Sequence, residues 1–334
     1  MLFIRYPQAT PHIPWLTLGV SPTPLEPALV AGRSILVKRD DLTAEPYGGN
    51  KVRKLEFILG DARARGARRL ITAGATGSHH ALSTTLYGRA SGFDVTTVLF
   101  PQHRTPHVRE VLEAIAAAGA DLRFTRRMET LPYAVWRARR EAGPAGYVVA
   151  AGGSDPIGTL GYVAAALELD EQLAGVQEPD AIHVAAGTLG TVAGLALGLA
   201  LAGRRIPLRA IRITSTLVTN TRALRRLVTG AARLLTAAGV PVGDAAARAL
   251  ESVTILDDQL GAGYGHATPE GERATELFAQ AGLTLDPTYT AKAAAAVLAS
   301  SDVRPLFWHT LSARMPAPAA SAPLPSPFAE YLSR

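Results

Sequence analysis

The fold is decided by the stretch GGNKVRKLE at residues 48–56, which follows a strand-like apolar run at 34–38. The two glycines favour a turn, and Asn50 can cap the helix that follows by accepting a hydrogen bond from its first N–H groups. We predict that this helix covers about 51–65, because Gly66 is typical of the residue just beyond a helix. The stretch therefore predicts a strand, a glycine-rich turn and a helix.

The same alternation continues along the chain, with apolar or β-branched runs between segments of helical character. Strands that alternate with helices favour a parallel sheet covered by helices, which is an α/β fold. Further strands are predicted at 69–73, 95–100, 121–124, 146–149 and 181–185, and further helices at about 78–91, 107–118, 131–141 and 160–173.

Lys51 stands at the start of its predicted helix, which is an unusual place for a cation. The helix dipole disfavours a positive charge there and lowers the pKa of the amine. A lowered pKa suits a lysine that forms an imine. An ordinary surface lysine on a first helical turn is the commoner explanation of this spacing alone.

A second glycine-rich turn, Gly187-Thr188-Leu189-Gly190-Thr191, joins the buried strand at 181–185 to an apolar helix that begins near residue 192. Free N–H groups at a helix start, together with the helix dipole, can bind a phosphate, and the two threonines add hydroxyl donors. The turn is neither a P-loop nor a full Gly-x-Gly-x-x-Gly pattern. A tight turn without a ligand would use glycine in the same way.

Single polar residues elsewhere carry weaker signals. Ser78-His79-His80 is compatible with a hydrolase or a metal site, but adjacent imidazoles on a helix point about 100° apart and do not easily share one metal. We therefore predict no metal site. Tyr264, Tyr289 and Thr310 each have an ordinary explanation when taken alone, either packing or a turn.

Length and composition limit the protein class. A chain of 334 residues exceeds the usual size of a single core, so two domains are expected. The chain contains no cysteine, which excludes disulfides, thiolate metal sites and a cysteine nucleophile. We see no signal peptide, and the apolar run at 192–202 is too short for a membrane span. The expected location is the cytoplasm, with no membrane partner.

The formal charge of +6 comes mainly from arginine, since the chain has only four lysines. A nucleic-acid-binding protein would be expected to interleave basic and exposed aromatic residues or to carry a known reader motif. Neither is present, so we predict no nucleic-acid partner. The basic segment around Arg222, Arg225 and Arg226 is interpreted as a solvated helix face.

Taken together and in order, these segments resemble the D-cysteine desulfhydrase and 1-aminocyclopropane-1-carboxylate (ACC) deaminase family. This family belongs to the tryptophan-synthase-β-like, fold type II enzymes that depend on pyridoxal 5′-phosphate (PLP). The resemblance runs from Pro14 to about Thr310. It is carried by KRDDL at 38–42 with GGNKVRKLE at 48–56, by GGS at 152–154 and by LDPTYT at 285–290.

The resemblance implies two open parallel-sheet αβα domains, the smaller inserted in the larger. The large PLP-binding domain would comprise 1–54 and 162–334, and the small domain 55–161. A homodimer that acts on a small amino acid is expected from the family.

The resemblance also implies residue roles. Lys51 would hold PLP as a Schiff base, and Asn50 would be among the cofactor-binding residues. Ser78 would handle protons or the substrate carboxylate, and Tyr264 and Tyr289 would be the active-site tyrosines. Residues Gly187, Thr188, Leu189, Gly190 and Thr191 would hold the phosphate. Thr310, with Thr290 as the alternative, would meet the pyridine nitrogen.

Three departures from the family pattern lie near the implied cofactor. His79 replaces an asparagine that touches the phenolic oxygen of the cofactor. Leu189 precedes Gly190 where the family has glycine or serine. Leu311-Ser312 follow Thr310 where the family has two glycines. These departures affect the expected substrate more than the expected fold.

The leading functional hypothesis is β-elimination of the D-cysteine desulfhydrase type, which gives an α-keto acid, ammonia and the leaving group. A neutral hydroxyl at the pyridine nitrogen makes the ring a milder electron sink, which suits elimination. ACC deaminase and a PLP-dependent β-replacement enzyme are the same-class alternatives. ACC deamination ranks lower because Thr290 stands where deaminases carry glutamate. Different-class alternatives are a non-catalytic PLP-binding protein and a basic nucleic-acid-binding protein.

Overall fold

The computed structural model describes residues 1–316 and 323–333, and their contacts group the chain into two compact units. The first unit comprises Met1–Ile13, Gly19–Lys54 and Ser154–Arg314. The second comprises Pro14–Leu18, Leu55–Gly153 and the described residues from Met315 onward. The predicted division into 1–54 with 162–334 and 55–161 stays a prediction.

The first unit is built on a six-stranded sheet in the order β1-β2-β10-β7-β8-β9. All neighbouring pairs are parallel except β1 with β2, which form an antiparallel hairpin at the edge. The strands are β1 (Leu25–Val30), β2 (Arg33–Arg39), β7 (Ala181–Ala186), β8 (Leu208–Arg212), β9 (Val253–Leu256) and β10 (Pro305–His309).

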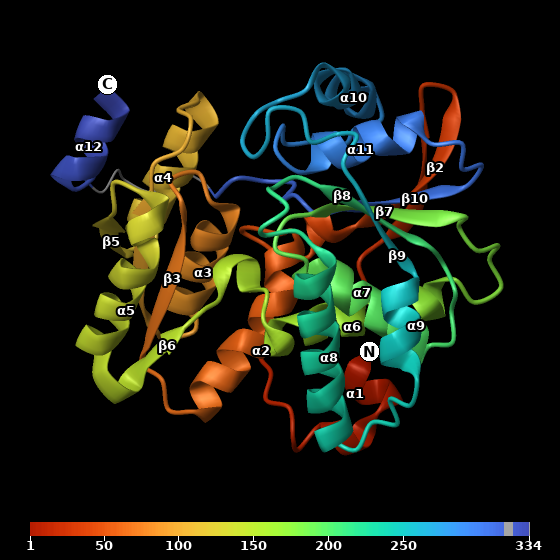
Figure 1. Cartoon of the computed structure of the whole chain (residues 1–334), viewed down its shortest axis with the longest axis horizontal. Helices are drawn as coiled ribbons and strands as arrows, with labels where there is room; N and C mark the ends of the chain where they lie inside the picture. The colour runs from red at the N-terminus through yellow and green to blue at the C-terminus, as the bar shows by residue number, and fades with distance from the viewer. Residues whose placement is uncertain (317–322, 334) are drawn as a thin grey trace. The chain divides into compact units, whose positions relative to one another are not determined.

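Helices cover both faces of this sheet, as Figure 1 shows, with α10 and α11 on one side and α6, α7 and α8 on the other. An apolar cluster that includes Ile211, Phe278 and Phe307 fills the side under α10 and α11. The helices of this unit are α1 (Leu2–Arg5), α6 (Pro156–Gln172), α7 (Gly190–Leu201), α8 (Thr221–Ala237), α9 (Ala245–Glu251), α10 (Pro269–Gln280) and α11 (Thr290–Ala299).

The second unit has a fully parallel four-stranded sheet in the order β5-β4-β3-β6. Its strands are β3 (Arg69–Ala75), β4 (Asp94–Phe100), β5 (Asp121–Phe124) and β6 (Gly146–Val148), and its helices are α3 (His79–Ala90), α4 (Pro106–Ala117), α5 (Leu131–Ala142) and α12 (Ser326–Ser333). Helix α2 (Asn50–Ala64) starts in the first unit and ends in the second. The predicted α/β class with parallel-sheet domains is confirmed.

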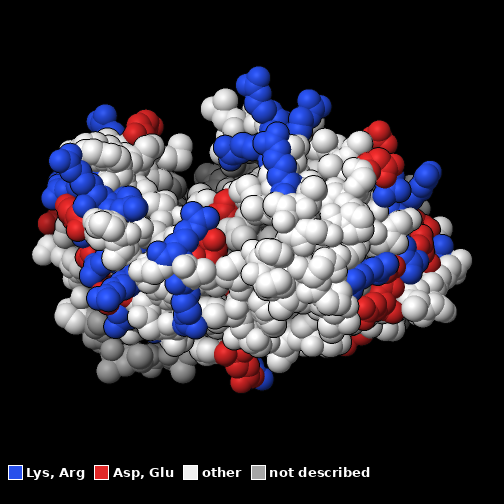
Figure 2. Space-filling view, turned by 90° about the horizontal axis from the view of Figure 1, so that it is seen from below, with Lys and Arg blue, Asp and Glu red and all other residues white. Residues whose placement is uncertain are grey.

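Helix hydrophobicity and surface charge bear on whether the protein contacts a membrane or a nucleic acid. No helix within residues 1–316 and 323–333 combines the length and the apolar character that crossing a membrane requires. On the face drawn in Figure 2, Lys and Arg side chains form several small groups with Asp and Glu among them, separated by broad uncharged areas.

Candidate active site

Parallel strands bring the predicted site segments of the first unit to one edge of its sheet. Strands β2, β10 and β7 are neighbours and run in the same direction, so the turns after all three lie at their carboxyl ends. Ligands of open α/β sheets bind at this edge. The turn before α2, residue Thr310 and the loop before α7 therefore belong to one region.

Asn50 links these three turns through hydrogen bonds. Its backbone N–H donates to the carbonyl of Thr310 at 3.0 Å, and its side-chain Nδ2 donates to Oγ1 of Thr191 at 3.1 Å. Gly49 precedes it with φ +85°, and a Cβ there would lie 2.8 Å from the Thr310 carbonyl oxygen. Glycine is therefore required at this close approach of two backbones.

Lys51 lies in the first turn of α2, as predicted. Its Nζ donates to Oδ1 of Asn50 at 2.7 Å and lies 5.9 Å from the ring centre of Tyr289. Burial lowers the pKa of Lys51 to about 8, although the charge of Asp286 acts in the opposite direction. Within the described part of the chain, no carboxylate forms an ion pair with Lys51. Its amine is therefore partly neutral near physiological pH.

The loop Gly187–Leu189 and the start of α7, here called the anion cradle, combine groups that can bind an anion; that they hold a phosphate stays a prediction. Leu189 has left-handed backbone geometry, φ +66°, at the N-cap of α7, where the first N–H groups lack intrahelical partners. A Cβ on Gly190 would lie 2.5 Å from Oγ of Ser154 and 3.0 Å from Nζ of Lys54, so only glycine fits. A phosphate at this helix start would meet N–H groups, hydroxyls and a lysine.

Sequence patterns did not assign Lys54 and Ser154 to this cradle. The hydroxyl of Ser154 accepts from the Gly190 N–H at 3.1 Å and lies 2.7 Å from that of Thr188, and Lys54 Nζ donates to it at 3.3 Å. Burial lowers the pKa of Lys54 well below its usual value, Lys51 lowers it further, and Asp155 opposes both. Lys54 follows Lys51 by three positions, which places both on one helix face, so this spacing was a usable signal.

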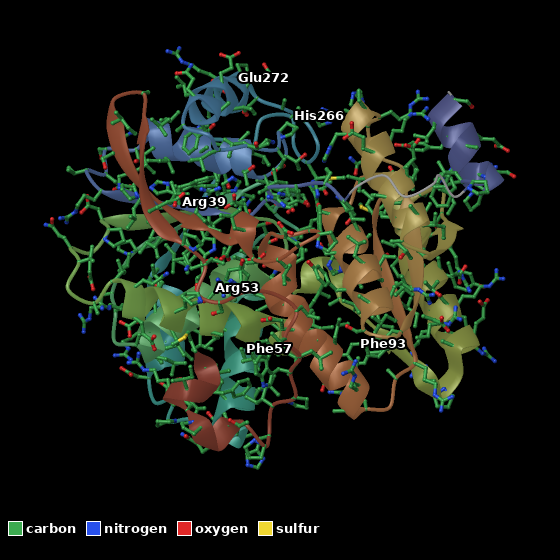
Figure 3. All side chains as sticks on the ribbon, turned by 180° about the vertical axis from the view of Figure 1, so that it is seen from behind. Arg39, Arg53, Phe57, Phe93, His266 and Glu272 are labelled. Atoms are coloured by element: carbon green, nitrogen blue, oxygen red, sulfur yellow. The ribbon has the colours of Figure 1, made fainter. Side chains whose placement is uncertain are left out.

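An ion-paired network anchors the beginning of α2 from inside the first unit. Arg53 donates to Asp40 and Glu168, and Lys38 forms a second ion pair with Glu168. Figure 3 shows Arg53 on the first turns of α2, and its side chain is buried. Arg53 contacts Oδ1 of Asp40, and Oδ2 accepts hydrogen bonds from the hydroxyl of Tyr162 and the indole N–H of Trp308, each at 2.7 Å. The helix that carries Lys51 is therefore held rigidly.

The two predicted active-site tyrosines lie together. Their hydroxyl oxygens are 2.8 Å apart and their rings meet edge to face. Burial raises the pKa of both Tyr264 and Tyr289. Asp286 fixes the turn before α11 by accepting backbone N–H bonds from Thr288 and Tyr289. Both phenols therefore stay protonated near neutral pH and can donate a hydrogen bond or a proton.

The two threonines considered for the pyridine nitrogen differ in their surroundings, and their roles stay predictions. The hydroxyl of Thr290 donates to Asp286 Oδ2 at 2.8 Å and accepts from the Asp286 N–H at 2.7 Å, so the turn uses it fully. Thr310 is buried directly after β10, at the edge that also holds Asn50. Ser312, one of the departures, accepts from the Gly48 N–H at 2.8 Å and so binds this segment to the turn before Lys51.

Ser78 and His79 lie in the second unit, and their roles toward the cofactor stay predictions. Ser78 caps α3 by accepting from the Ala81 N–H at 3.2 Å, which leaves its own hydroxyl hydrogen available to donate. Nε2 of His79 lies 3.1 Å from Nε2 of His107. His80 is buried against Thr72, so this histidine is structural. Within residues 1–316 and 323–333, no three His, Asp or Glu side chains cluster to hold a metal.

The donor set of the first unit fits PLP. A lysine amine of lowered pKa can join the aldehyde, and the loop before α7 can hold the phosphate. The family model described as pyridoxal-phosphate dependent enzyme matches residues 16–304. The chain belongs to this family. Its dependence on PLP and its fold type II architecture, both predicted from the sequence, are thereby confirmed.

Relatives whose activities are named support this membership. The chain is 36% identical over 323 residues to nocardicin C-9′ epimerase of Nocardia uniformis subsp. tsuyamanensis, covering 92% of this chain and 94% of that one. It is 34% identical over 303 residues to D-cysteine desulfhydrase of Klebsiella pneumoniae, covering 86% and 88%. A crystal structure of an ACC deaminase homologue is 32% identical, with a TM-score of 0.74 and 93% and 94% coverage.

Proposed function

We propose that this PLP-dependent enzyme is a lyase acting on a small amino acid, with β-elimination from D-cysteine as the leading activity. The observation that carries the proposal is Lys51, a half-buried lysine with a pKa of about 8 that shares one sheet edge with the loop before α7. The desulfhydrase relatives support the choice of D-cysteine.

The proposed roles begin with Lys51 and Lys54. PLP supplies a carbonyl carbon that joins the substrate amine and a ring that withdraws electrons from the α-carbon. Lys51 then accepts the proton from the substrate Cα–H bond. At a pKa of about 8, roughly a tenth of the Lys51 amine is neutral at pH 7 in the PLP-free protein. Lys54, Ser154 and the start of α7 hold the phosphate and so fix the orientation of the bound substrate.

The Tyr264–Tyr289 pair has the chemistry of a proton donor rather than a base, because burial raises both pKa values. We assign it to the leaving group. As the Cβ–S bond breaks, sulfur leaves with the bonding electron pair and takes a proton from the pair. The released 2-aminoacrylate reacts with water to give pyruvate and ammonia.

Product analysis with PLP-loaded protein tests this proposal. Equal amounts of pyruvate, ammonia and sulfide from D-cysteine are expected, and Tyr289→Phe is expected to lower kcat by about 10²–10⁴-fold, the range for a lost proton donor. Loss of only PLP binding in this variant would contradict the assigned role. ACC giving 2-oxobutanoate would favour the deaminase alternative, and a new amino acid would favour β-replacement. No product from any amino acid would favour a non-catalytic PLP-binding protein.

Epimerisation is a second candidate, favoured by the 36% identity to an epimerase over 92% of the chain. It requires the same proton removal by Lys51 but returns a proton to the opposite face of the α-carbon. Chiral chromatography separates the two activities, because an epimerase inverts its substrate and releases no pyruvate.

We also propose that the enzyme works as a homodimer in the cytoplasm. The support is the family resemblance, and neither statement affects the chemistry above. Light scattering of the purified holoenzyme is expected to give twice the chain mass, and a monomer would contradict the first statement. Fractionation of the source cells tests the second.

A further inference from the structure

Lys292 is a fully buried lysine that the mechanism above does not use. It lies in the first turn of α11, among the alanines of the apolar cluster. Its Nζ donates to the carbonyl of Leu260 at 2.8 Å and to that of Gly263 at 2.9 Å. Within the described part of the chain, no carboxylate forms an ion pair with it. Its amine is therefore committed to two backbone carbonyls of one loop.

That loop, residues 257–268, joins β9 to α10 without helix or strand of its own. Gly261, Gly263 and Gly265 all have positive φ, at +57°, +109° and +80°. Glycine loses the most conformational freedom when it is ordered, so a loop with three glycines needs tertiary bonds to hold one shape. The two bonds from Lys292 provide such a restraint at the centre of the loop.

The loop carries Tyr264, which directly follows Gly263. The partner of Tyr264 is Tyr289, three residues before Lys292 and at the N-cap of the same helix. The lysine therefore joins the backbone beside one tyrosine to the helix that begins at the other. Its two bonds set the separation across which the hydroxyls meet at 2.8 Å.

We propose that Lys292 is a positioning residue for the Tyr264–Tyr289 proton-donor pair. The role of Lys292 in turnover rests on the proposed function, whereas its hydrogen bonds to the loop do not. A protonated amine donates strong hydrogen bonds to carbonyl oxygens at a buried site. Methionine has a similar length and volume but no donor, so it would leave both carbonyls unsatisfied.

The test compares Lys292→Met with Val297→Ala, a buried substitution five residues further along the same helix, whose side chain has no hydrogen-bond donor to offer the loop. Hydrogen exchange of the backbone amides at 258–266 is the readout that does not need activity. Lys292→Met is expected to speed this exchange by on the order of tenfold or more, as for the loss of two hydrogen bonds. Val297→Ala is expected to leave the loop unchanged. Equal effects of the two variants, or none in Lys292→Met, would overturn the proposal.

Kinetics then test the connection to the tyrosine pair. Lys292→Met is expected to lower kcat more than it changes KM, to retain the visible band of bound PLP, and to add no further loss in a Tyr264→Phe background. Fully additive losses would show that Lys292 does not act through Tyr264. If Lys292→Met does not fold, Lys292→Leu, which also removes the donor, is used with the same criteria. If Lys292→Met speeds hydrogen exchange in the loop but the wild-type protein shows no turnover, Lys292 still positions the loop. Only the proposed activity is then refuted.

Discussion

Buried and half-buried cations of the first unit occupy two different environments. In the ion-paired network, Lys38 and Arg53 both contact Glu168, and Arg53 also contacts Asp40. Lys51 and Lys292, in contrast, are bonded to amide or carbonyl oxygens. Burial alone would raise the pKa of Glu168, but Arg53 and Lys38 outweigh this effect and hold it at about 2. Burial dominates at Lys51 and lowers its pKa to about 8.

The comparison shows how one fold can favour the charged form of some lysines and arginines and leave another lysine amine reactive. A carboxylate at contact distance stabilises the charged form of a buried lysine. Burial still lowers the pKa of Lys38, although Asp40 and Glu168 act on it in this way. A lysine whose neighbours are neutral oxygens loses its proton more easily. The network holds the start of α2 in place through Arg53. Lys51, two residues earlier on the same helix, has an amine that can react.

The largest expected effect comes from removing the shared carboxylate of the network. Glu168→Ala leaves Lys38 and Arg53 buried with one partner fewer, which is expected to lower the free energy of unfolding by about 3–5 kcal/mol. Denaturant unfolding measures this, with Glu276→Ala on exposed α10 surface as the control, expected within about 0.5 kcal/mol. A loss in Glu168→Ala no larger than that of the control would remove the distinction between the two environments.

The second prediction concerns the cost of keeping Lys51 charged. Its pKa falls from 10.5 to about 8, a change of about 2.5 units, and each unit corresponds to about 1.36 kcal/mol. Lys51→Met removes this penalty and should therefore stabilise the PLP-free protein at pH 7, by at most about 3 kcal/mol because the hydrogen bond to Asn50 is also lost.

The sign of the pH dependence follows from the direction of that shift. The folded protein disfavours the charged form, so the penalty is complete below pH 8 and disappears as the pH rises to 10.5. The advantage of Lys51→Met should disappear over the same range. Lys38→Met is the matched comparison, and it should destabilise because Glu168 loses a partner. A Lys51→Met variant less stable than wild type at pH 7 would contradict this account.

The smallest effect is expected at the anion cradle. Lys54→Met removes a donor beside Ser154 and should weaken PLP binding about tenfold, equivalent to about 1.4 kcal/mol. Equilibrium dialysis in a Lys51→Ala background measures the phosphate contribution without the covalent link. Unchanged affinity would place the phosphate away from Lys54.

Local sequence patterns predicted the elements that carry the site. The turn before α2 and the loop before α7 were found because glycine, apolar runs and helix caps act over a few residues. The antiparallel strand β1 was missed, since Glu26 and Pro27 interrupt its apolar pattern at an edge where proline is tolerated. A strand whose apolar pattern is interrupted in this way is therefore not found from apolar runs alone.

Contacts between distant residues could not be predicted in the same way. Ser154 meets Thr188 and Gly190 only because α6 packs on α7, and no periodicity in the sequence encodes that contact. The hydrogen bond from the Thr290 hydroxyl to Asp286 could not be predicted from the sequence pattern either. Leu189 takes backbone geometry usually reserved for glycine, and burial of its side chain offsets that cost.

The most direct test of the central claim is to map where PLP is attached. Borohydride reduction of the PLP-loaded protein fixes the covalent link, and peptide mass spectrometry identifies the modified residue among only four lysines. The account predicts modification of Lys51 and none at Lys38, Lys54 or Lys292. Modification at Lys54 or Lys292 in place of Lys51, or no modification at all, would contradict it.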